Sequence, residues 1–338
     1  MPYSAEFFRR QRDGSRRSAR EIVPLVLELL DVRSVVDVGC GVGTWLSVFE
    51  ENGIHDTLGI DWHQSVDLLE IAPERFIVRD LTGRLDLERE FDLVVSLEVG
   101  EHLSDEFAGS YIRSLTALGP VVLFSAAIPY QGGTHHVNEQ WPPYWVGHFG
   151  TQGYRVVDCI RESVWDNEKV NWFYAQNMLL FVRSDRLRMY PKLQRAEERR
   201  RHSVLSMVHP RQYTETQRLR LTLEDISQVV APTEGLILVD EWLLGDAQLA
   251  VRRATRFTEH DGEWLGNPAD DDDAIAKFCR LRQTGGSRFI AFVWPAFWWL
   301  EYYTGLNQYL RRQCRCVLEN DRLVVFDLRS PGAAAADP

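Results

Sequence analysis

The most constraining feature of the sequence is a glycine-rich turn between a strand-like segment and a helix-like segment. It lies within residues 35–45, VVDVGCGVGTW, where every second residue from Gly39 to Gly43 is glycine. Glycine lets the backbone turn sharply and lets a ligand approach the main chain closely. Free N–H groups at the start of the following helix favour an anionic group such as a carboxylate. The turn therefore predicts a ligand site at the carboxyl end of a strand.

Strand-like and helix-like segments alternate through the first half of the chain. Apolar segments typical of strands lie at residues 34–39, 56–61, 75–81, 91–99, 121–127, 154–160 and 175–182. Helical patterns cover residues 18–30, 44–53 and 106–118. This alternation predicts an α/β fold with a doubly wound, mostly parallel sheet covered by helices on both faces. The last two strands follow one another with no helix expected between them, which indicates an antiparallel edge.

The pattern changes after residue 184. Residues 185–230 are charged and helix-prone, and they predict a helical connector. Further strand-like segments lie at residues 235–241, 287–294, 314–320 and 321–328, with a predicted helix at 270–286 whose acidic start suits the helix dipole. We therefore expect four parts in the chain. They are a ligand-binding domain at 1–184, the connector at 185–230, a smaller α/β or α+β domain at 231–330, and a disordered tail at 331–338.

Composition and charge disfavour several classes of protein. The chain has 338 residues and a net charge of −11, whereas a broad nucleic-acid surface needs clustered Lys and Arg. The basic residues 9–20 are interpreted as one solvated helix. No stretch approaches the ~18 apolar residues of a membrane helix, and the first residues lack the pattern of a secretory signal. Five cysteines without a CxxC pair argue against a disulfide framework and a structural zinc site. We expect a cytoplasmic protein with no nucleic-acid or membrane partner.

Polar residues follow the next strands at the same predicted edge of the sheet. Asp61 ends the second strand, at about the 20-residue spacing from Gly39 that is typical of a carboxylate binding ribose hydroxyls. Trp62 is placed to lie against an adenine ring, and Asp80 to meet an adenine amino group. The spacing GxGxG differs from the GxGxxG of nicotinamide-binding turns, so a different nucleoside-containing cofactor is favoured.

As a set, DVGCGVGTW, LGID, VRDL and SLEVGEHL resemble the successive motifs of class I S-adenosylmethionine-dependent methyltransferases, over residues 20–183. The resemblance implies S-adenosylmethionine as the cofactor and S-adenosylhomocysteine as the product. It implies that Asp37 and the glycines hold the methionine part, Asp61 the ribose, and Asp80 with the next residue the adenine. The predicted cofactor-binding residues are Asp37, Gly39, Cys40, Gly41, Gly43, Asp61, Trp62, Asp80, Leu81, Ser96 and Glu98.

Two segments offer side chains for the transfer chemistry. His102 follows the fourth strand, where the resembled class often borders its methyl-transfer pocket, although a helix-start or packing role also fits. The segment 128–145 follows the fifth strand, is expected to be a long loop, and resembles the HxN…W stretch of a subgroup of these enzymes. We predict His136 as a base or acceptor-orienting group, with Asn138 beside it and His102 as the other catalytic candidate. The alternative is a hydrophobic lid with a solvated His135.

These residues predict methyl transfer to a small molecule or a sugar or glycan, at oxygen rather than nitrogen, with histidine-assisted deprotonation. The alternative is a non-catalytic cofactor-binding subunit that regulates or scaffolds a biosynthetic complex. A nucleic-acid methyltransferase is disfavoured by charge and because no Asn/Asp-Pro-Pro-aromatic motif follows the fourth strand. Asp105, Glu106 and Glu139 show no ligand spacing, so no metal is expected. The oligomeric state is left open, with a homodimer as one expectation.

The second module contains one unusual segment, WPAFWWLEYY at residues 294–303. An exposed aromatic platform there would suit sugar stacking or a partner surface. We favour a buried element that packs a strand against a helix. The segment and the terminal strand faintly resemble modules attached to bacterial sugar-modifying enzymes, which supports a glycan acceptor as one expectation.

Overall fold

The structure is a computed structural model that describes residues 5–62, 68–133, 135–200, 204–241, 243–244, 253–257, 259–260, 263–264 and 266–329. The chain divides into two compact units, Met1–Thr214 and Glu215–Pro338. Within the described residues, no helix has both the length and the apolar character needed to cross a membrane. The predicted disordered tail at 331–338 lies outside the described residues.

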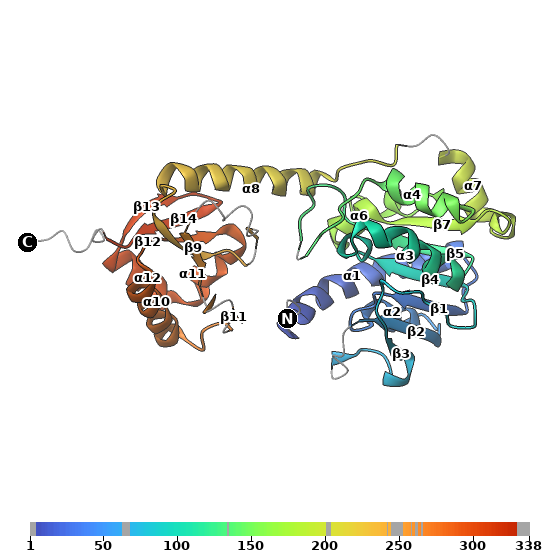
Figure 1. Cartoon of the computed structure of the whole chain (residues 1–338), viewed down its shortest axis with the longest axis horizontal. Coiled ribbons are helices and arrows are strands. Elements are labelled where there is room, and N and C mark those ends of the chain that lie inside the picture. The colour runs from blue at the N-terminus through green and yellow to red at the C-terminus, as the bar shows by residue number, and fades with distance from the viewer. Residues whose placement is uncertain are drawn as a thin grey trace, which may run out of the picture. The chain divides into compact units, whose positions relative to one another are not determined.

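The N-terminal unit is built on a seven-stranded sheet (Figure 1). Its strands are β1 (Ser34–Val38), β2 (Asp56–Asp61), β3 (Phe76–Val78), β4 (Leu93–Leu97), β5 (Val121–Ser125), β6 (Tyr154–Val157) and β7 (Leu179–Arg183). Their order is β3-β2-β1-β4-β5-β7-β6, and β7 alone of the seven runs antiparallel, between β5 and β6. The chain order reverses between β1 and β4, and ligands of open α/β sheets bind at the carboxyl ends of strands beside such a switch point.

Helices cover both faces of this sheet, which confirms the predicted doubly wound fold. One face packs against α1 (Ala5–Leu29) and α2 (Thr44–Glu51), and the other against α3 (Asp105–Leu118) and α4 (Pro142–Thr151). A hydrophobic core lies on each face of the sheet, and successive residues of β1 point into the two cores alternately. Val35 lies in the core beside α1 and α2, and Val36 lies in the core beside α3 and α4. A strand buried on both faces is continuously apolar, which is why these segments were recognisable in the sequence.

The region between β5 and β7 differs from the prediction. The predicted loop 128–145 ends early, because α4 begins at Pro142. Two short helices, α5 (Arg161–Val164) and α6 (Trp172–Asn177), separate β6 from β7, so the predicted strand 175–182 starts only at Leu179. A short apolar stretch does not distinguish a strand from a buried helical turn, and that ambiguity produced the error. The antiparallel pairing itself is confirmed.

Two helices fall in the segment predicted as a connector, α7 (Pro191–Arg200) and α8 (Pro210–Val229), and the boundary between the units lies within α8. A 3-10 turn, η4 (Leu187–Met189), precedes α7. The C-terminal unit has a second sheet in the order β13-β14-β12-β8-β9. Its strands are β8 (Gly235–Val239), β9 (Arg253–Arg256), β12 (Ser287–Val293), β13 (Arg315–Glu319) and β14 (Leu323–Asp327). A two-residue pair, β10 (Glu259–His260) and β11 (Glu263–Trp264), lies apart from it.

Helices of the C-terminal unit pack on this smaller sheet, so the expected second α/β module is confirmed as a fold. They are α10 (Asp271–Gly285), α11 (Trp298–Tyr302) and α12 (Thr304–Gln313), with a 3-10 turn η5 (Trp294–Ala296) before α11. The aromatic segment enters this core through Trp299 and Tyr303, which are 3% and 2% exposed. It is thus a strand-to-helix packing element, as favoured above, although Tyr302 is exposed.

Candidate functional site

The glycine turn joins β1 to α2, and its glycines meet two different demands. Gly39 and Gly41 have φ values of 84° and 57°, in the left-handed region that favours glycine. A Cβ on Gly39 would lie 2.3 Å from the side chain of Val99, so this position also requires a close approach. A Cβ on Gly41 would meet nothing within 4 Å. Glycine is therefore required at position 39 so that Val99 can pack against the turn, whereas Gly41 borders open space.

Two buried carboxylates lie beside this turn. Asp61, at the end of β2, accepts hydrogen bonds from the N–H of Gly41 at 2.8 Å and from the N–H of Trp62 at 2.7 Å. Asp37, in β1, is 2% exposed. Burial, and secondarily the charge of Asp61, raise the pKa of Asp37 well above its usual range. A cationic group bound at the turn would stabilise the ionised carboxylate of Asp37 and so offset the energetic cost of burying its charge.

The other predicted cofactor residues differ in exposure. Trp62 is 52% exposed, and Asp80 is exposed and accepts hydrogen bonds from Thr82. Leu81 and Cys40 are buried, and burial followed by the charge of Asp37 raises the pKa of the Cys40 thiol. Ser96 is fully buried in β4, where its hydroxyl is 2.6 Å from that of Tyr111, so its side chain belongs to the interior of the sheet.

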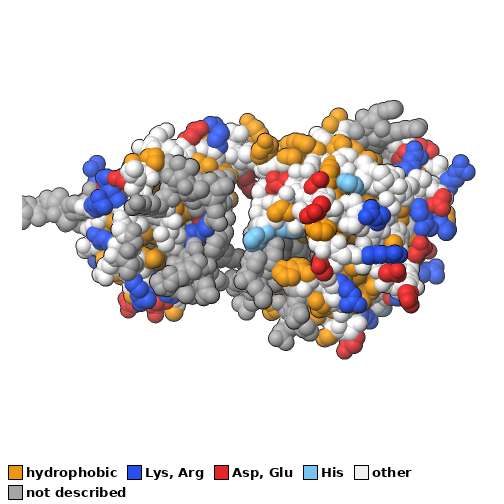
Figure 2. Space-filling view, in the orientation of Figure 1, with side chains coloured by type: hydrophobic (Ala, Val, Ile, Leu, Met, Phe, Trp, Pro, Cys, Tyr) orange, Lys and Arg blue, Asp and Glu red, His pale blue; other side chains and the backbone are white. Residues whose placement is uncertain are grey.

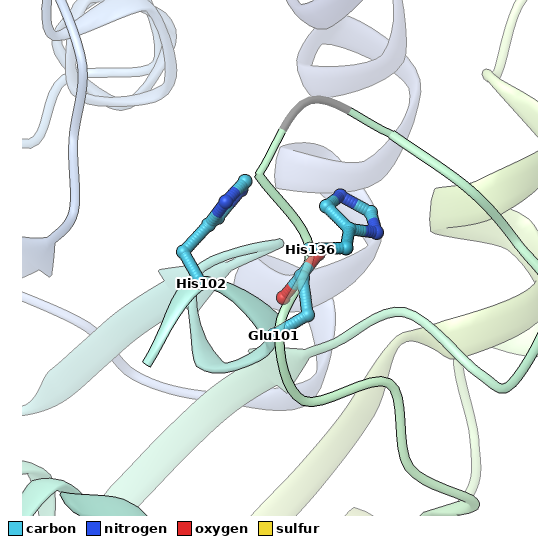
Figure 3. Close-up of side chains that lie close together, drawn as sticks. All are labelled: Glu101, His102 and His136. Carbon is cyan, nitrogen blue, oxygen red and sulfur yellow. The ribbon is translucent and has the colours of Figure 1, made fainter. Parts of the chain in front are cut away.

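A second cluster lies after β4 and β5 and contains both predicted histidines. His102 ends the 3-10 turn η3 (Gly100–His102), and His136 comes from the segment after β5. Their rings are 4.9 Å apart, edge to face. Figure 3 shows the carboxylate of Glu101 between these two side chains. The segments are tied together because the N–H groups of Val137 and Asn138 donate to the carbonyl oxygen of Glu101 at 2.9 and 3.0 Å.

Each histidine is oriented by an acceptor at its Nδ1 atom. His136 Nδ1 is 2.9 Å from a carboxylate oxygen of Glu139, and His102 Nδ1 is 3.3 Å from the carbonyl oxygen of His135. Because these partners accept hydrogen bonds, Nδ1 of each ring carries a proton. Burial, and secondarily the nearby His136, lower the pKa of His102 to about 4, which leaves it neutral at neutral pH.

Glu139 organises the segment that carries His136. Its carboxylate also accepts the backbone N–H groups of Tyr130 at 2.8 Å and Gly132 at 2.7 Å. Burial opposes ionisation of Glu139, but these donors and His136 outweigh it and lower the pKa. Asn138 is 3% exposed and accepts a hydrogen bond from Gln140, so it packs beneath the loop, whereas His135 is exposed.

Glu101 is a candidate functional residue that the sequence analysis missed. It is 0% exposed, and neither carboxylate oxygen has a hydrogen-bond partner within the described residues. Burial and the neighbouring charge of Glu98 raise its pKa well above the usual range, although nearby backbone N–H groups offset part of the rise. Glu98 itself accepts hydrogen bonds from the side-chain amides of Asn177 and Gln131. The signal available in the sequence was two glutamates three residues apart, next to a histidine.

The glycine turn and the histidine cluster are neighbours in the fold. Val99, which contacts Gly39, immediately precedes η3 and therefore Glu101 and His102. Both sites lie at the carboxyl ends of β1, β4 and β5, which are adjacent in the sheet. The arrangement places the glycine turn beside a histidine pair that can accept or orient a hydroxyl proton.

Comparison with known proteins gives a family match to the N-terminal unit. A family model described as a methyltransferase domain matches residues 8–151. No curated relative matches the chain at a significant level.

Solved structures with a similar fold cover about half of the chain. The methyltransferase domain of bacterial CtHen1 is 20% identical, with 49% of this chain and 97% of that chain covered and a TM-score of 0.38. Magnesium protoporphyrin IX methyltransferase from Synechocystis PCC 6803, with bound SAH, is 20% identical, with 51% and 84% covered and a TM-score of 0.38. Streptomyces venezuelae DesVI is 18% identical, with 50% and 93% covered and a TM-score of 0.39.

Proposed function

Because residues 8–151 belong to the class I S-adenosylmethionine-dependent methyltransferases, we propose that this enzyme methylates an oxygen atom of a small molecule or a sugar or glycan. The observation that carries the proposal is the adjacency of the glycine turn to the pair His102 and His136, at the ends of neighbouring parallel strands. The turn binds the cofactor, and the histidine pair assists loss of the acceptor proton.

The residues of the turn fit S-adenosylmethionine. Gly41 leaves open space where a side chain would stand, so the main chain can be approached closely. Asp37, a buried carboxylate with a raised pKa, suits the ammonium of the methionine part. Asp61 suits the ribose, and the exposed ring of Trp62 suits the adenine. Cys40 and Gly43 complete the turn, with Asp80, Leu81, Ser96 and Glu98 as the remaining predicted cofactor residues.

The histidine pair supplies the proton chemistry. When bound, S-adenosylmethionine supplies an electrophilic methyl group. His136 has the arrangement of a general base, since Glu139 holds its Nδ1–H and leaves Nε2 as an acceptor. A hydroxyl acceptor needs such help more than a neutral amine, which supports oxygen as the target. Asn138 and Glu139 position this loop, and His102 stays neutral beside it.

The surface of the N-terminal unit supports a small or neutral acceptor. On the face shown in Figure 2, its acidic and basic side chains are interspersed and form no single-sign patch. Together with the net charge of −11, this disfavours an extended polyanion, which is bound by clustered Lys and Arg.

Calorimetric titration with S-adenosylmethionine and S-adenosylhomocysteine, followed by a methyl-transfer assay on a panel of hydroxyl and amine acceptors, tests the proposal. We expect micromolar cofactor binding and transfer to hydroxyl acceptors. Replacing His136 by Ala is expected to slow turnover by a factor of about 10²–10⁴ and to leave cofactor affinity unchanged. Equal turnover in the variant would place the base elsewhere. Cofactor binding with no transfer to any acceptor would favour the regulatory or scaffolding alternative.

A further inference from the structure

The cluster of Glu101, His102 and His136 has the composition of a metal site. Each residue offers one ligand atom, and the three atoms lie within 4.8 Å of one another. The residues come from two separate segments, η3 and the loop after β5. Backbone hydrogen bonds from the loop to the carbonyl oxygen of Glu101 hold the two segments together. Figure 3 shows the three side chains close together, with the Glu101 carboxylate between the two histidines.

The strongest indication is the state of the Glu101 side chain. A fully buried carboxylate without a hydrogen-bond partner is costly, and such a group in a native fold requires an explanation. Glu101 is such a group within the described residues, and it faces the two imidazoles. A bound cation would coordinate the oxygens that the described part of the chain leaves without hydrogen bonds.

The hydrogen bonds of the two histidines point to the same conclusion. Metal-ligating histidines usually donate their other ring N–H to a carboxylate or a backbone carbonyl, which fixes the tautomer and the ring orientation. His136 makes this contact with the Glu139 carboxylate, and His102 makes it with the carbonyl of His135. Both rings therefore have, at Nδ1, a partner of the kind found around metal ions.

We propose that Glu101, His102 and His136 bind a divalent transition-metal ion. Two imidazoles and one carboxylate suit ions such as Zn²⁺, Fe²⁺ or Co²⁺ better than Mg²⁺ or Ca²⁺, which prefer oxygen ligands. Ligand atoms about 2.1 Å from such an ion lie closer together than the present atoms, so binding draws the side chains inward. The proposal departs from the expectation of no metal, which considered Asp105, Glu106 and Glu139 but not Glu101.

The function of the ion rests on the proposed O-methyl transfer. Three protein ligands leave coordination positions open for an oxygen atom of the acceptor. A hydroxyl bound to the ion has a lowered pKa, so its O–H bond breaks and the proton passes to water, while the oxygen keeps the electron pair. In the loaded enzyme the histidines therefore assist deprotonation as ligands, and His136 acts as a base only without the ion.

Titration of the metal-free full-length protein with Co²⁺, followed by visible absorption, tests the site without cofactor or acceptor. We expect saturable binding of one ion, which is lost in Glu101→Gln and His136→Ala and retained in the control His55→Ala, whose histidine is exposed before β2. Stoichiometric Zn²⁺ should displace Co²⁺, whereas equimolar Mg²⁺ should not. Calorimetry with S-adenosylmethionine shows that each variant is folded.

Three results would overturn the proposal. They are the absence of saturable Co²⁺ binding, its persistence in both Glu101→Gln and His136→Ala, and displacement by equimolar Mg²⁺. Because cofactor affinity is measured separately, loss of the metal site leaves the methyltransferase assignment standing. Absence of cofactor binding in a protein that still takes up Co²⁺ would contradict the proposed function and not the metal site.

Discussion

At the scale of single residues, positions 39 and 41 show that two glycines of one turn are required for different reasons. Gly39 accommodates the side chain of Val99, whereas Gly41 borders open space, which we propose the cofactor fills. The structure therefore separates the effect of a substitution on folding from its effect on binding. This distinction leads to a test with a matched control, because Gly53 has a similarly positive φ and equally open surroundings at the other end of α2.

We expect Gly41→Ala and Gly53→Ala to destabilise the protein by a similar amount, about 1–2 kcal/mol, because each forces a non-glycine residue into the left-handed region. Only Gly41→Ala should weaken S-adenosylmethionine binding, since its Cβ enters the ligand space. Chemical denaturation and calorimetry measure the two quantities. Equal cofactor affinity in the two variants would contradict the assignment of the turn.

Asp37 allows a prediction about pH. Its pKa in the folded state is raised by burial above the unfolded value of about 3.9, so the folded state binds the proton more tightly. The stability that this carboxyl contributes is therefore present below about pH 4 and is lost as the pH rises through the folded-state pKa. Asp37→Asn should raise the melting temperature of the cofactor-free protein at neutral pH, with a difference that shrinks toward acid pH.

The same Asp37→Asn variant should lose affinity for S-adenosylmethionine, because the amide has no charge to pair with the ammonium. Thermal unfolding with and without cofactor measures both effects in one experiment. A variant that is less stable than the original at neutral pH would show that the carboxylate is already compensated in the cofactor-free protein.

At the scale of elements, the short helices after β6 are held by a buried ion pair. Arg161, which is 1% exposed, binds both carboxylate oxygens of Asp158, at 3.0 and 2.6 Å, and also donates to the carbonyl oxygens of Gln176 and Leu205. One side chain thus joins α5, α6 and the segment after α7. Such a pair is costly to break on one side only, because the remaining charge stays buried.

Replacing Arg161 by Met should destabilise the N-terminal unit by about 3–5 kcal/mol, as measured by urea denaturation. The double variant Arg161→Met with Asp158→Leu should recover a large part of the loss, because no buried charge remains. A double variant as unstable as the single one would show that the bonds to Gln176 and Leu205 matter more than the charge pair.

The elements also show how far the sequence predicts the fold and the site. Strands such as β1 and β4 are fully buried and mostly apolar, and they flank recognisable turns, so their type and order could be inferred. The helices α5 and α6 are four and six residues long, too short for a period to be visible. The burial of Glu101 depends on packing by residues distant in the chain, and a glutamate beside a histidine resembles a solvated surface in sequence. Its role therefore required the structure.

At the scale of the whole molecule, each unit has its own hydrophobic cores. The N-terminal unit extends past the predicted boundary at residue 184, because later residues complete its hydrogen bonds. The carbonyl of Leu205 binds Arg161, and the N–H of His209 donates to the side chain of Gln176 at 2.7 Å. Both contacts lie next to α6, whose last residue binds Glu98 of the candidate site.

A chain ending at Thr214 is therefore expected to fold and to bind S-adenosylmethionine with the affinity of the full chain. A chain ending at residue 184 should be less stable, by about 1–3 kcal/mol for each buried polar group left without its partner. Denaturation and calorimetry of the two truncated chains provide the comparison. Equal stability would mean that residues 185–214 contribute nothing to the fold of this unit.

The loop that carries His136 has a further consequence for laboratory evolution of new acceptor preferences. Its internal hydrogen bonds converge on Glu139, and its far end is fixed to the carbonyl of Glu101. The loop is thus held both by Glu139 within it and by hydrogen bonds to Glu98, Glu101 and His102. Libraries that keep His136 and Glu139 and randomise the exposed Tyr130 and Val137 would explore new acceptors without disturbing the position of the histidine.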